Sequence, residues 1–278
     1  MERALLFLTT LLLVSSAWAG GEAVSFPGPS ITLQGRLYRP AGDGPFPAFV
    51  LLHGCNGLWQ REGQPYRSYE AWARHWQEHG YLALLVDSFG PRGEKEICTQ
   101  RNRRISPERD RPRDAYAALR WLAARADVDA ARIHLQGWSN GAMAVLSAIA
   151  EDAPGRTGDG PQFRSAVAFY PGCGLAMRRL EYRTHIPLLI EAGAADDWTP
   201  AVHCEALVQK FRGPSTPMDI DVYPGAHHAF DGFGAVRERP EVRNASSPTG
   251  WGATVGANPE ARAKALQRTT EWVAEHDR

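Results

Sequence analysis

Three side chains that could together activate a hydroxyl group occur along the chain in the order Ser139, Asp196 and His228. A serine hydroxyl is a weak nucleophile near neutral pH and needs a base, such as a histidine, to accept its proton. A carboxylate beside that histidine fixes its tautomer and stabilises the charge that the ring acquires. The three residue types therefore predict covalent attack by Ser139, with His228 as general base and Asp196 as the acid that orients it.

Ser139 is the centre of the motif Gly137-Trp138-Ser139-Asn140-Gly141. The apolar run 132–136 before the motif predicts a strand, and the run 142–150 after it predicts a helix. A sharp turn between the two exposes the serine, and the flanking glycines leave room for a close backbone approach. An ordinary strand-to-helix turn with a capping serine is the alternative. Trp138, next to the serine, is a candidate substrate-binding residue.

Both partners of Ser139 occur beside an identical residue. Asp196 and Asp197 follow the apolar run 186–193, and His227 and His228 follow the run 217–223. The spacing of Asp196 from the preceding glycine and the following proline favours it over Asp197, which could instead cap the next helix. Similar spacing favours His228 and leaves His227 as a rim residue or a structural hydrogen-bonding group.

Attack on a carbonyl also requires hydrogen-bond donors for the oxyanion that develops. One candidate is the backbone N–H of Asn140, at the start of a predicted helix, where unpaired amides and the helix dipole favour negative charge. The second should come from the loop after the apolar run 48–52, so the N–H of Cys55 is the candidate and that of Asn56 the reserve. We interpret His53 as a brace for this loop.

Strands and helices alternate between these residues. Besides the runs already named, residues 81–86 and 164–170 predict strands, and helices are expected over 69–80, 107–126, 201–211 and 259–276. The alternating run 31–38 predicts an edge strand, residues 20–30 a linker, and residues 229–256 an irregular segment. The fold class is α/β, a mostly parallel doubly wound sheet with helices on both faces and the candidate residues at the carboxyl ends of its strands.

The assembled motifs resemble those of the dienelactone hydrolase family of α/β-hydrolases, from about residue 31 to the final helix. The matching segments are 53–57, 87–93, 137–141, 193–200 and 223–230. The resemblance implies an α/β-hydrolase fold and cleavage of esters or lactones without a cofactor. The enzyme that names the family has a cysteine in place of Ser139 and is of cytoplasmic type, so its enol-lactone substrate does not carry over.

Arg92 follows a predicted strand and should lie near the mouth of the site. A guanidinium there could hold a substrate carboxylate with two hydrogen bonds. A salt bridge within the surrounding arginine-rich loop is an equal alternative.

The start of the chain indicates export. A short basic-containing start, an apolar stretch and an A-x-A ending predict a signal peptide over residues 1–19 and a single domain over residues 20–278, secreted or periplasmic. An uncleaved anchor is the alternative, and no later stretch is apolar enough to cross a membrane. With 31 basic and 31 acidic residues, nothing in the overall charge favours a nucleic acid or an anionic membrane as partner.

The four cysteines, Cys55, Cys98, Cys173 and Cys204, all lie in the exported part, which favours disulfides. Three pairings are open, and we favour Cys55 with Cys98 and Cys173 with Cys204 because each pair would join loops on the same rim. No metal site is expected. The possible ligands lack a pair at helical spacing; they are His203, Cys204, His227, His228 and Asp231.

Together these features predict a secreted serine hydrolase that cleaves small-molecule carboxylic esters or lactones and needs no cofactor. A peptidase on the same fold and a non-catalytic binding protein on a hydrolase scaffold are the alternatives. The sequence does not indicate the acyl or alcohol specificity or the oligomeric state.

Overall fold

The computed structural model of the protein describes residues 21–214 and 216–277. The predicted signal peptide, residues 1–19, lies outside the described residues.

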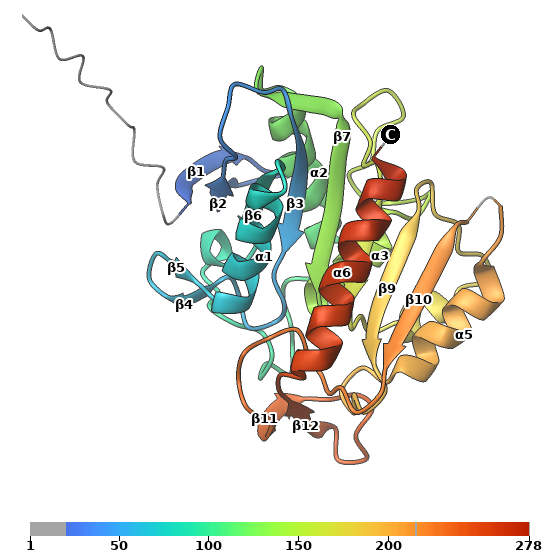
Figure 1. Cartoon of the computed structure of the whole chain (residues 1–278). Coiled ribbons are helices and arrows are strands. Elements are labelled where there is room, and N and C mark those ends of the chain that lie inside the picture. The colour runs from blue at the N-terminus through green and yellow to red at the C-terminus, as the bar shows by residue number, and fades with distance from the viewer. Residues whose placement is uncertain (1–20, 215, 278) are drawn as a thin grey trace, which may run out of the picture.

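An eight-stranded sheet forms the centre of the fold (Figure 1). Strands β6, β3, β7, β8, β9 and β10 run parallel to one another, whereas β2 is antiparallel to both β1 and β6. The predicted fold class is therefore confirmed. In spatial order the strands are β1 (Glu22–Pro27), β2 (Thr32–Tyr38), β6 (Leu82–Asp87), β3 (Phe46–Leu52), β7 (Val128–Trp138), β8 (Ala166–Phe169), β9 (Leu188–Gly193) and β10 (Met218–Tyr223).

Helices cover both faces of the sheet. In Figure 1, α1 (Arg67–Glu78) and α6 (Pro259–His276) lie in front of it, and their buried side chains share one apolar cluster. The other face packs against α2 (Asp110–Ala123), α3 (Asn140–Ala148) and α5 (Ala201–Phe211). Because successive side chains of a strand point to opposite faces, Val50 and Leu51 enter different clusters. Burial on both faces explains why the central strands are continuous apolar runs.

Asn258 caps α6, because its side chain accepts a hydrogen bond from the backbone N–H of Ala261. Two short elements complete the helical structure, the 3₁₀ turn η1 (Gly90–Arg92) and α4 (Gly174–Met177).

The prediction of a linker over residues 20–30 was wrong. Residues 22–27 form β1, which pairs with β2 along its whole length, so β2 is an interior strand and not the predicted edge. Only Phe26 of β1 is buried, and one buried residue gives too weak a periodic pattern to mark a strand.

The segment 229–256 is also more ordered than predicted. It contains a hairpin of β11 (Arg237–Arg243) and β12 (Trp251–Val255), which lies beyond the carboxyl ends of the parallel strands (Figure 1). The sequence of β11 is almost entirely polar, and only Val242 of that strand is buried, so no hydrophobic alternation marked it. A smaller hairpin, β4 (Trp59–Arg61) with β5 (Gln64–Pro65), was likewise not predicted.

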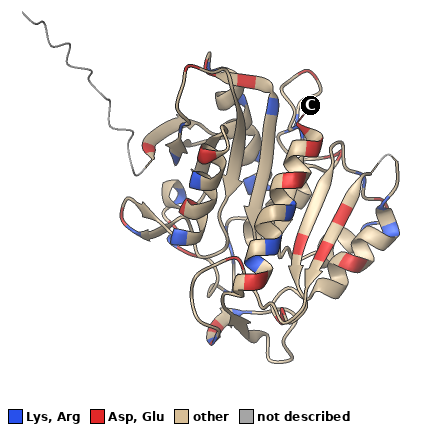
Figure 2. Cartoon of the chain, in the orientation of Figure 1, with Lys and Arg blue, Asp and Glu red and all other residues tan. Residues whose placement is uncertain are grey.

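Acidic and basic residues are interspersed over the helices, strands and loops (Figure 2), in keeping with the equal numbers of the two kinds. Within residues 21–214 and 216–277, no helix combines the length and apolar character needed to span a bilayer.

Candidate active site

Ser139 lies at the turn between β7 and α3 in a strained backbone conformation, with φ 53° and ψ −115°. Positive φ is rare for a residue with a side chain and is retained mostly where function requires it. The flanking glycines make the turn possible. A Cβ at position 137 would lie 2.6 Å from the carbonyl of Gly141, and one at position 141 would lie 2.1 Å from the carbonyl oxygen of Leu52. The turn therefore has the geometry predicted for an exposed nucleophile.

The structure brings Ser139, His228 and Asp196 into one hydrogen-bonded row. Nε2 of His228 lies 2.9 Å from Oγ of Ser139, and Nδ1 of His228 lies 2.8 Å from Oδ2 of Asp196. Ser139 is partly exposed, whereas Asp196 and His228 are buried. The imidazole can accept the serine proton at one nitrogen while the carboxylate holds the other, which is the arrangement that hydroxyl activation needs.

Asp196 is held as an anion by a network that the sequence did not reveal. Its Oδ1 accepts hydrogen bonds from the backbone N–H groups of Trp198 and Thr199, each at 2.9 Å, and the Thr199 hydroxyl donates to its Oδ2 at 2.9 Å. Burial by itself would raise the pKa of Asp196, but the nearby His228 and the hydrogen bonds from His228 and Thr199 lower it below its usual value.

The neighbouring residues of each pair have other partners. The carboxylate of Asp197 accepts hydrogen bonds from the backbone N–H and the hydroxyl of Thr254, both at 2.8 Å, so Asp197 supports the β11–β12 hairpin and does not cap α5 as suggested. Nδ1 of His227 lies 2.9 Å from the carbonyl oxygen of Ala195, which makes it a structural hydrogen-bonding group.

Two backbone N–H groups beside Ser139 are available as oxyanion donors. Within the part of the chain that the structure describes, neither the N–H of Cys55 nor that of Asn140 donates a hydrogen bond. Both residues line a pocket together with Ser139. A buried cation lies behind them, because Nη1 of Arg111 donates to the side-chain oxygen of Asn140 at 2.8 Å. Burial lowers the pKa of Arg111 to about 10, so it keeps its charge at neutral pH.

His53 braces the same loop, as interpreted from the sequence. Its Nδ1 lies 2.8 Å from the carbonyl oxygen of Gly54, and its Nε2 accepts the backbone N–H of Ser88 at 3.2 Å. Complete burial and the nearby charge of Arg111 lower the pKa of His53 well below its usual value, so the ring is neutral.

Trp138, the candidate substrate-binding residue next to Ser139, is held by a buried hydrogen bond. Its side chain is fully buried, and Nε1 donates to Oδ2 of Asp231 at 2.9 Å, so the indole packs beneath the site, although the residue is among those that line the larger pocket. Asp231 also accepts hydrogen bonds from Trp72, at 2.8 Å, and from the hydroxyl of Tyr170, at 2.7 Å. The ring of Tyr170 in turn packs 4.6 Å from that of His228.

The sequence prediction missed Asp231, Tyr170 and Thr199 as parts of the site. Tyr170 is the last residue of the predicted strand 164–170, Asp231 lies three residues after His228, and Thr199 lies three residues after Asp196. That position is typical of a residue whose N–H meets an aspartate side chain in a turn.

Arg92 is engaged in a salt bridge. Its two terminal nitrogens each lie 2.8 Å from an oxygen of Asp114, and one of them also donates to the carbonyl oxygen of Ser88 at 2.7 Å. The guanidinium is thus occupied by its own loop and helix α2, and Arg92 does not line either pocket at Ser139. The guanidinium therefore has the structural role of a salt bridge, as the alternative suggested, but its partner Asp114 lies on α2 and not within the arginine-rich loop.

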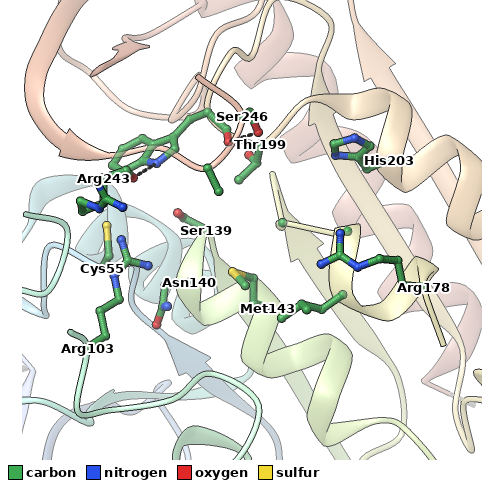
Figure 3. A pocket seen from close by; sticks show the side chains of 15 residues that line it. Cys55, Arg103, Ser139, Asn140, Met143, Arg178, Thr199, His203, Arg243 and Ser246 are labelled. Atoms are coloured by element: carbon green, nitrogen blue, oxygen red, sulfur yellow. Dashed lines mark hydrogen bonds between the residues drawn. The ribbon is translucent and has the colours of Figure 1, made fainter. Parts of the chain in front are cut away.

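Two pockets meet at Ser139. The smaller one, about 410 Å³, extends past Asn140 and Met143. Figure 3 shows Arg103 and Arg243 on one side of Ser139 and Arg178 with His203 on the opposite side. The larger one, about 750 Å³, contains His228.

The two pockets differ in charge. None of the described residues that line the smaller pocket is acidic, although three are arginines. The larger pocket has both signs. Its basic residues are Arg67, Arg237 and Arg239, and its acidic residues are Glu96, Asp231, Glu238 and Glu241.

The four cysteines form two disulfides, Cys55–Cys98 and Cys173–Cys204, the pairing that the sequence favoured. Among residues 21–214 and 216–277 there is no cluster of three or more His, Cys, Asp or Glu side chains arranged to hold a metal ion.

The model of the dienelactone hydrolase family matches residues 33–277. A Yersinia pestis protein named "Putative carboxymethylenebutenolidase" is 24% identical over 248 residues, which cover 84% of this chain and 79% of that protein.

Two solved structures share the fold. Esterase 2 of Thermogutta terrifontis, phosphorylated by paraoxon, has a TM-score of 0.60 at 21% identity, covering 92% of this chain and 94% of that one. A dienelactone hydrolase-like promiscuous phosphotriesterase from metagenomic libraries has a TM-score of 0.62 at 19% identity, covering 92% and 98% of the two chains.

Proposed function

The chain belongs to the dienelactone hydrolase family, and on that premise we propose that it is a serine hydrolase that cleaves carboxylic esters or lactones through an acyl-enzyme on Ser139. The observation that carries the proposal is the row of hydrogen bonds from Ser139 through His228 to Asp196, with distances of 2.9 and 2.8 Å. This row lies at the carboxyl ends of the parallel strands, where enzymes with open α/β sheets have their active sites.

The reaction has two halves. Oγ of Ser139 attacks the ester carbonyl carbon and passes its proton to Nε2 of His228, while Asp196 stabilises the imidazolium. The N–H groups of Cys55 and Asn140 bind the oxyanion until the C–O bond breaks and His228 protonates the departing alcohol. Water then attacks the acyl-enzyme with the same base and releases the acid and free Ser139.

Because the leaving group must be protonated, the position of His228 indicates which part of the substrate each pocket would bind. The departing oxygen must lie within reach of His228, which lines only the larger of them. The alcohol portion of the substrate is therefore placed in the larger pocket. The acyl portion occupies the smaller one, past Asn140 and Met143.

The charge of the smaller pocket favours an acyl portion that carries a second, anionic group. Among the described residues, Arg103, Arg178 and Arg243 form no ion pair. Burial lowers the pKa of the Arg103 guanidinium, and the positive charge of the nearby Arg243 lowers it further. The carboxylate of Glu96 acts in the opposite direction. Two guanidinium groups that repel each other beside a pocket without acidic residues favour a carboxylate between them.

Monoethyl adipate and ethyl hexanoate, which have acyl chains of equal length, test this preference. We expect kcat/KM to be at least about tenfold higher for the anionic ester, since a charge-assisted hydrogen bond contributes about 1.5–3 kcal/mol. Arg243→Gln should remove most of that advantage and leave ethyl hexanoate unaffected. Arg239→Gln, which changes an arginine of the larger pocket, is the matched control. Equal losses on both esters would argue against an acyl-side carboxylate.

The function itself is tested on a panel of neutral esters, lactones and an aminoacyl amide, with paraoxon as a covalent probe. Paraoxon is chosen because it phosphorylates an esterase of the same fold. Turnover of esters or lactones with stoichiometric labelling of Ser139 supports the proposal. Cleavage of the amide alone would favour the peptidase, and labelling of a different residue would refute the assignment of the nucleophile.

We further propose that the protein is exported, with residues 1–19 as a cleaved signal peptide and residues 20–278 as one domain. The two disulfides favour an oxidising compartment. Expression with the full leader should yield a mature protein that begins at Gly20, as determined by N-terminal sequencing. A chain that keeps Met1 in the membrane fraction would indicate an uncleaved anchor.

A further inference from the structure

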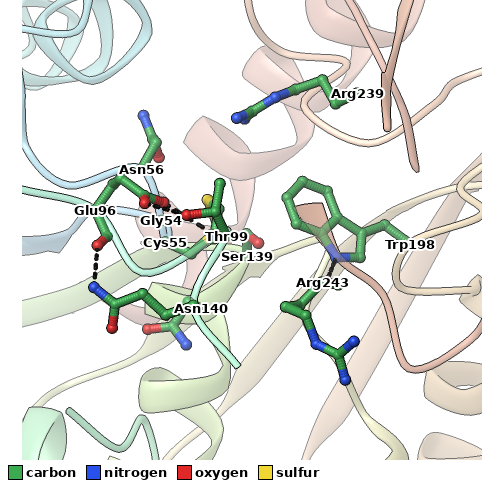
Figure 4. The surroundings of a disulfide bond; sticks show 12 residues. Gly54, Cys55, Asn56, Glu96, Thr99, Ser139, Asn140, Trp198, Arg239 and Arg243 are labelled. Carbon is green, nitrogen blue, oxygen red and sulfur yellow. Dashed lines mark hydrogen bonds between the residues drawn. A yellow bond between two sulfur atoms is a disulfide. The ribbon is translucent and has the colours of Figure 1, made fainter. Parts of the chain in front are cut away.

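The Cys55–Cys98 disulfide is attached to the loop that supplies an oxyanion donor. Cys55 belongs to both pockets at Ser139, and Figure 4 shows it beside Ser139 and Asn140. Besides the brace from His53, the residues around Cys55 are held by a few hydrogen bonds, one of them from the hydroxyl of Tyr69 to Oδ1 of Asn56 at 2.7 Å. The N–H of Gly57 donates to the carbonyl of Gly54 at 3.3 Å, and the N–H of Gly54 donates to the hydroxyl of Tyr69 at 2.8 Å.

Cys55 itself is fixed from the side of Cys98. Its sulfur is bonded to that of Cys98, and its carbonyl oxygen accepts a hydrogen bond from the N–H of Ile97 at 2.8 Å. Both residues of the 97–98 segment are buried. The position of the Cys55 peptide therefore depends on a segment that is remote in sequence.

The 97–98 segment is also linked, through hydrogen bonds, to Trp198, which packs on His228. The carbonyl of Cys98 accepts the N–H of Arg243 at 2.9 Å, and the carbonyl of Arg243 accepts Nε1 of Trp198 at 2.8 Å. The ring of Trp198 lies 4.7 Å from that of His228. The disulfide thus ties the oxyanion loop to the structure that positions the general base.

We infer that the Cys55–Cys98 disulfide is a positioning element of the oxyanion hole, which holds the N–H of Cys55 at the distance that the transition state requires. The inference rests on the proposed function. Oxyanion stabilisation depends on donors that are in place before charge develops, and removal of one donor typically lowers kcat by 10²- to 10³-fold. If the loop can move by about 1 Å, a large part of the contribution of its N–H donor to kcat is lost.

The second disulfide provides a matched control. Cys173–Cys204 closes a loop of similar length, with a sequence separation of 31 against 43 for Cys55–Cys98, and the Cα–Cα distance is 5.0 Å in both. The loss of stability on removal should therefore be similar. Cys173 and Cys204 do not line either pocket and contribute no proposed oxyanion donor.

The test compares the full mature chain with Cys55→Ala/Cys98→Ala and Cys173→Ala/Cys204→Ala, below the unfolding temperature of all three. On a neutral ethyl ester, kcat of the first variant should fall by about 10²-fold with KM nearly unchanged. Its affinity for a trifluoromethyl ketone, which forms an oxyanion on Ser139, should fall by a similar factor. The control variant should keep kcat and inhibitor affinity within about threefold. Equal losses in both variants, or an unchanged kcat in the first, would overturn the inference.

A second measurement covers the case in which Cys55→Ala/Cys98→Ala does not fold. Cys173→Ala/Cys204→Ala keeps Cys55–Cys98 as its single disulfide, so mild reduction of the folded variant should lower kcat and reoxidation should restore it. If reduction leaves kcat unchanged, the positioning role is refuted while the proposed function stands. If the wild-type chain cleaves no ester or lactone, the proposed function fails and the inference fails with it.

Discussion

Replacement of Ser139 by alanine should lower kcat for ester cleavage on the order of 10⁶-fold, the loss typical of a serine nucleophile that acts as a unit with its base and acid. The variant keeps the strained turn, the two N–H donors and both pockets, but it has no oxygen to form an acyl-enzyme. KM should change little, because the substrate-binding surface is the same. The measurement is a steady-state comparison on ethyl esters in a pH-stat.

Ser246→Ala is the control for this substitution. Ser246 lines the smaller pocket, and its hydroxyl donates to the carbonyl oxygen of Trp198 at 3.2 Å, with no contact to His228. Its kcat should stay within about twofold of the wild type, as expected for an exposed residue. Undiminished cleavage by Ser139→Ala would show that another group is the nucleophile and would refute the proposed mechanism.

The parts of the site that were predicted well from the sequence are those determined by residues close to one another in the chain. The glycines around Ser139 are required by contacts of 2.6 Å and 2.1 Å that any side chain would make, so the turn is evident in the motif itself. Asp196 lies three residues after the predicted strand 186–193, and His228 lies five residues after the predicted strand 217–223. Because the carboxyl ends of parallel strands lie at one edge of the sheet, the positions of these residues in the sequence were enough to predict that they lie close together.

The parts that were missed depend on contacts between segments distant in sequence. Asp231 is buried under hydrogen bonds from Trp72, Trp138 and Tyr170, which come from α1, β7 and the end of β8. No local pattern specifies such a convergence. The role suggested for Arg92 failed for the same reason, since its partner Asp114 lies on α2, 22 residues further along the chain.

The arginines of the smaller pocket are another feature that could not be predicted from the sequence. Arg103 belongs to an irregular loop, Arg178 follows α4, and Arg243 ends β11. Two of these three elements were not predicted. The charge of the pocket therefore became visible only when the three segments were placed around Ser139.

Replacement of Asp196 by asparagine should lower kcat at neutral pH by about 10⁴-fold, as expected when the acid of such a row is neutralised. Asparagine can still accept the N–H groups of Trp198 and Thr199, so the turn is retained. It cannot stabilise the imidazolium, however, and its amide N–H favours the wrong tautomer of His228. KM should be nearly unchanged, and far-UV circular dichroism should show a folded protein.

Asp197→Asn is the matched control, because it makes the same chemical change one residue along the chain. The carboxylate of Asp197 accepts two hydrogen bonds from Thr254 on β12 and does not contact His228. Loss of the Asp197 carboxylate should weaken the attachment of the β11–β12 hairpin. It should leave kcat within about threefold of the wild-type value, as for substitutions outside the reacting groups. A larger loss of kcat in Asp197→Asn than in Asp196→Asn would reverse the assignment of the acid. Losses of equal size would mean that neither carboxylate acts specifically on His228, and the low pKa of Asp196 would then have only a structural consequence.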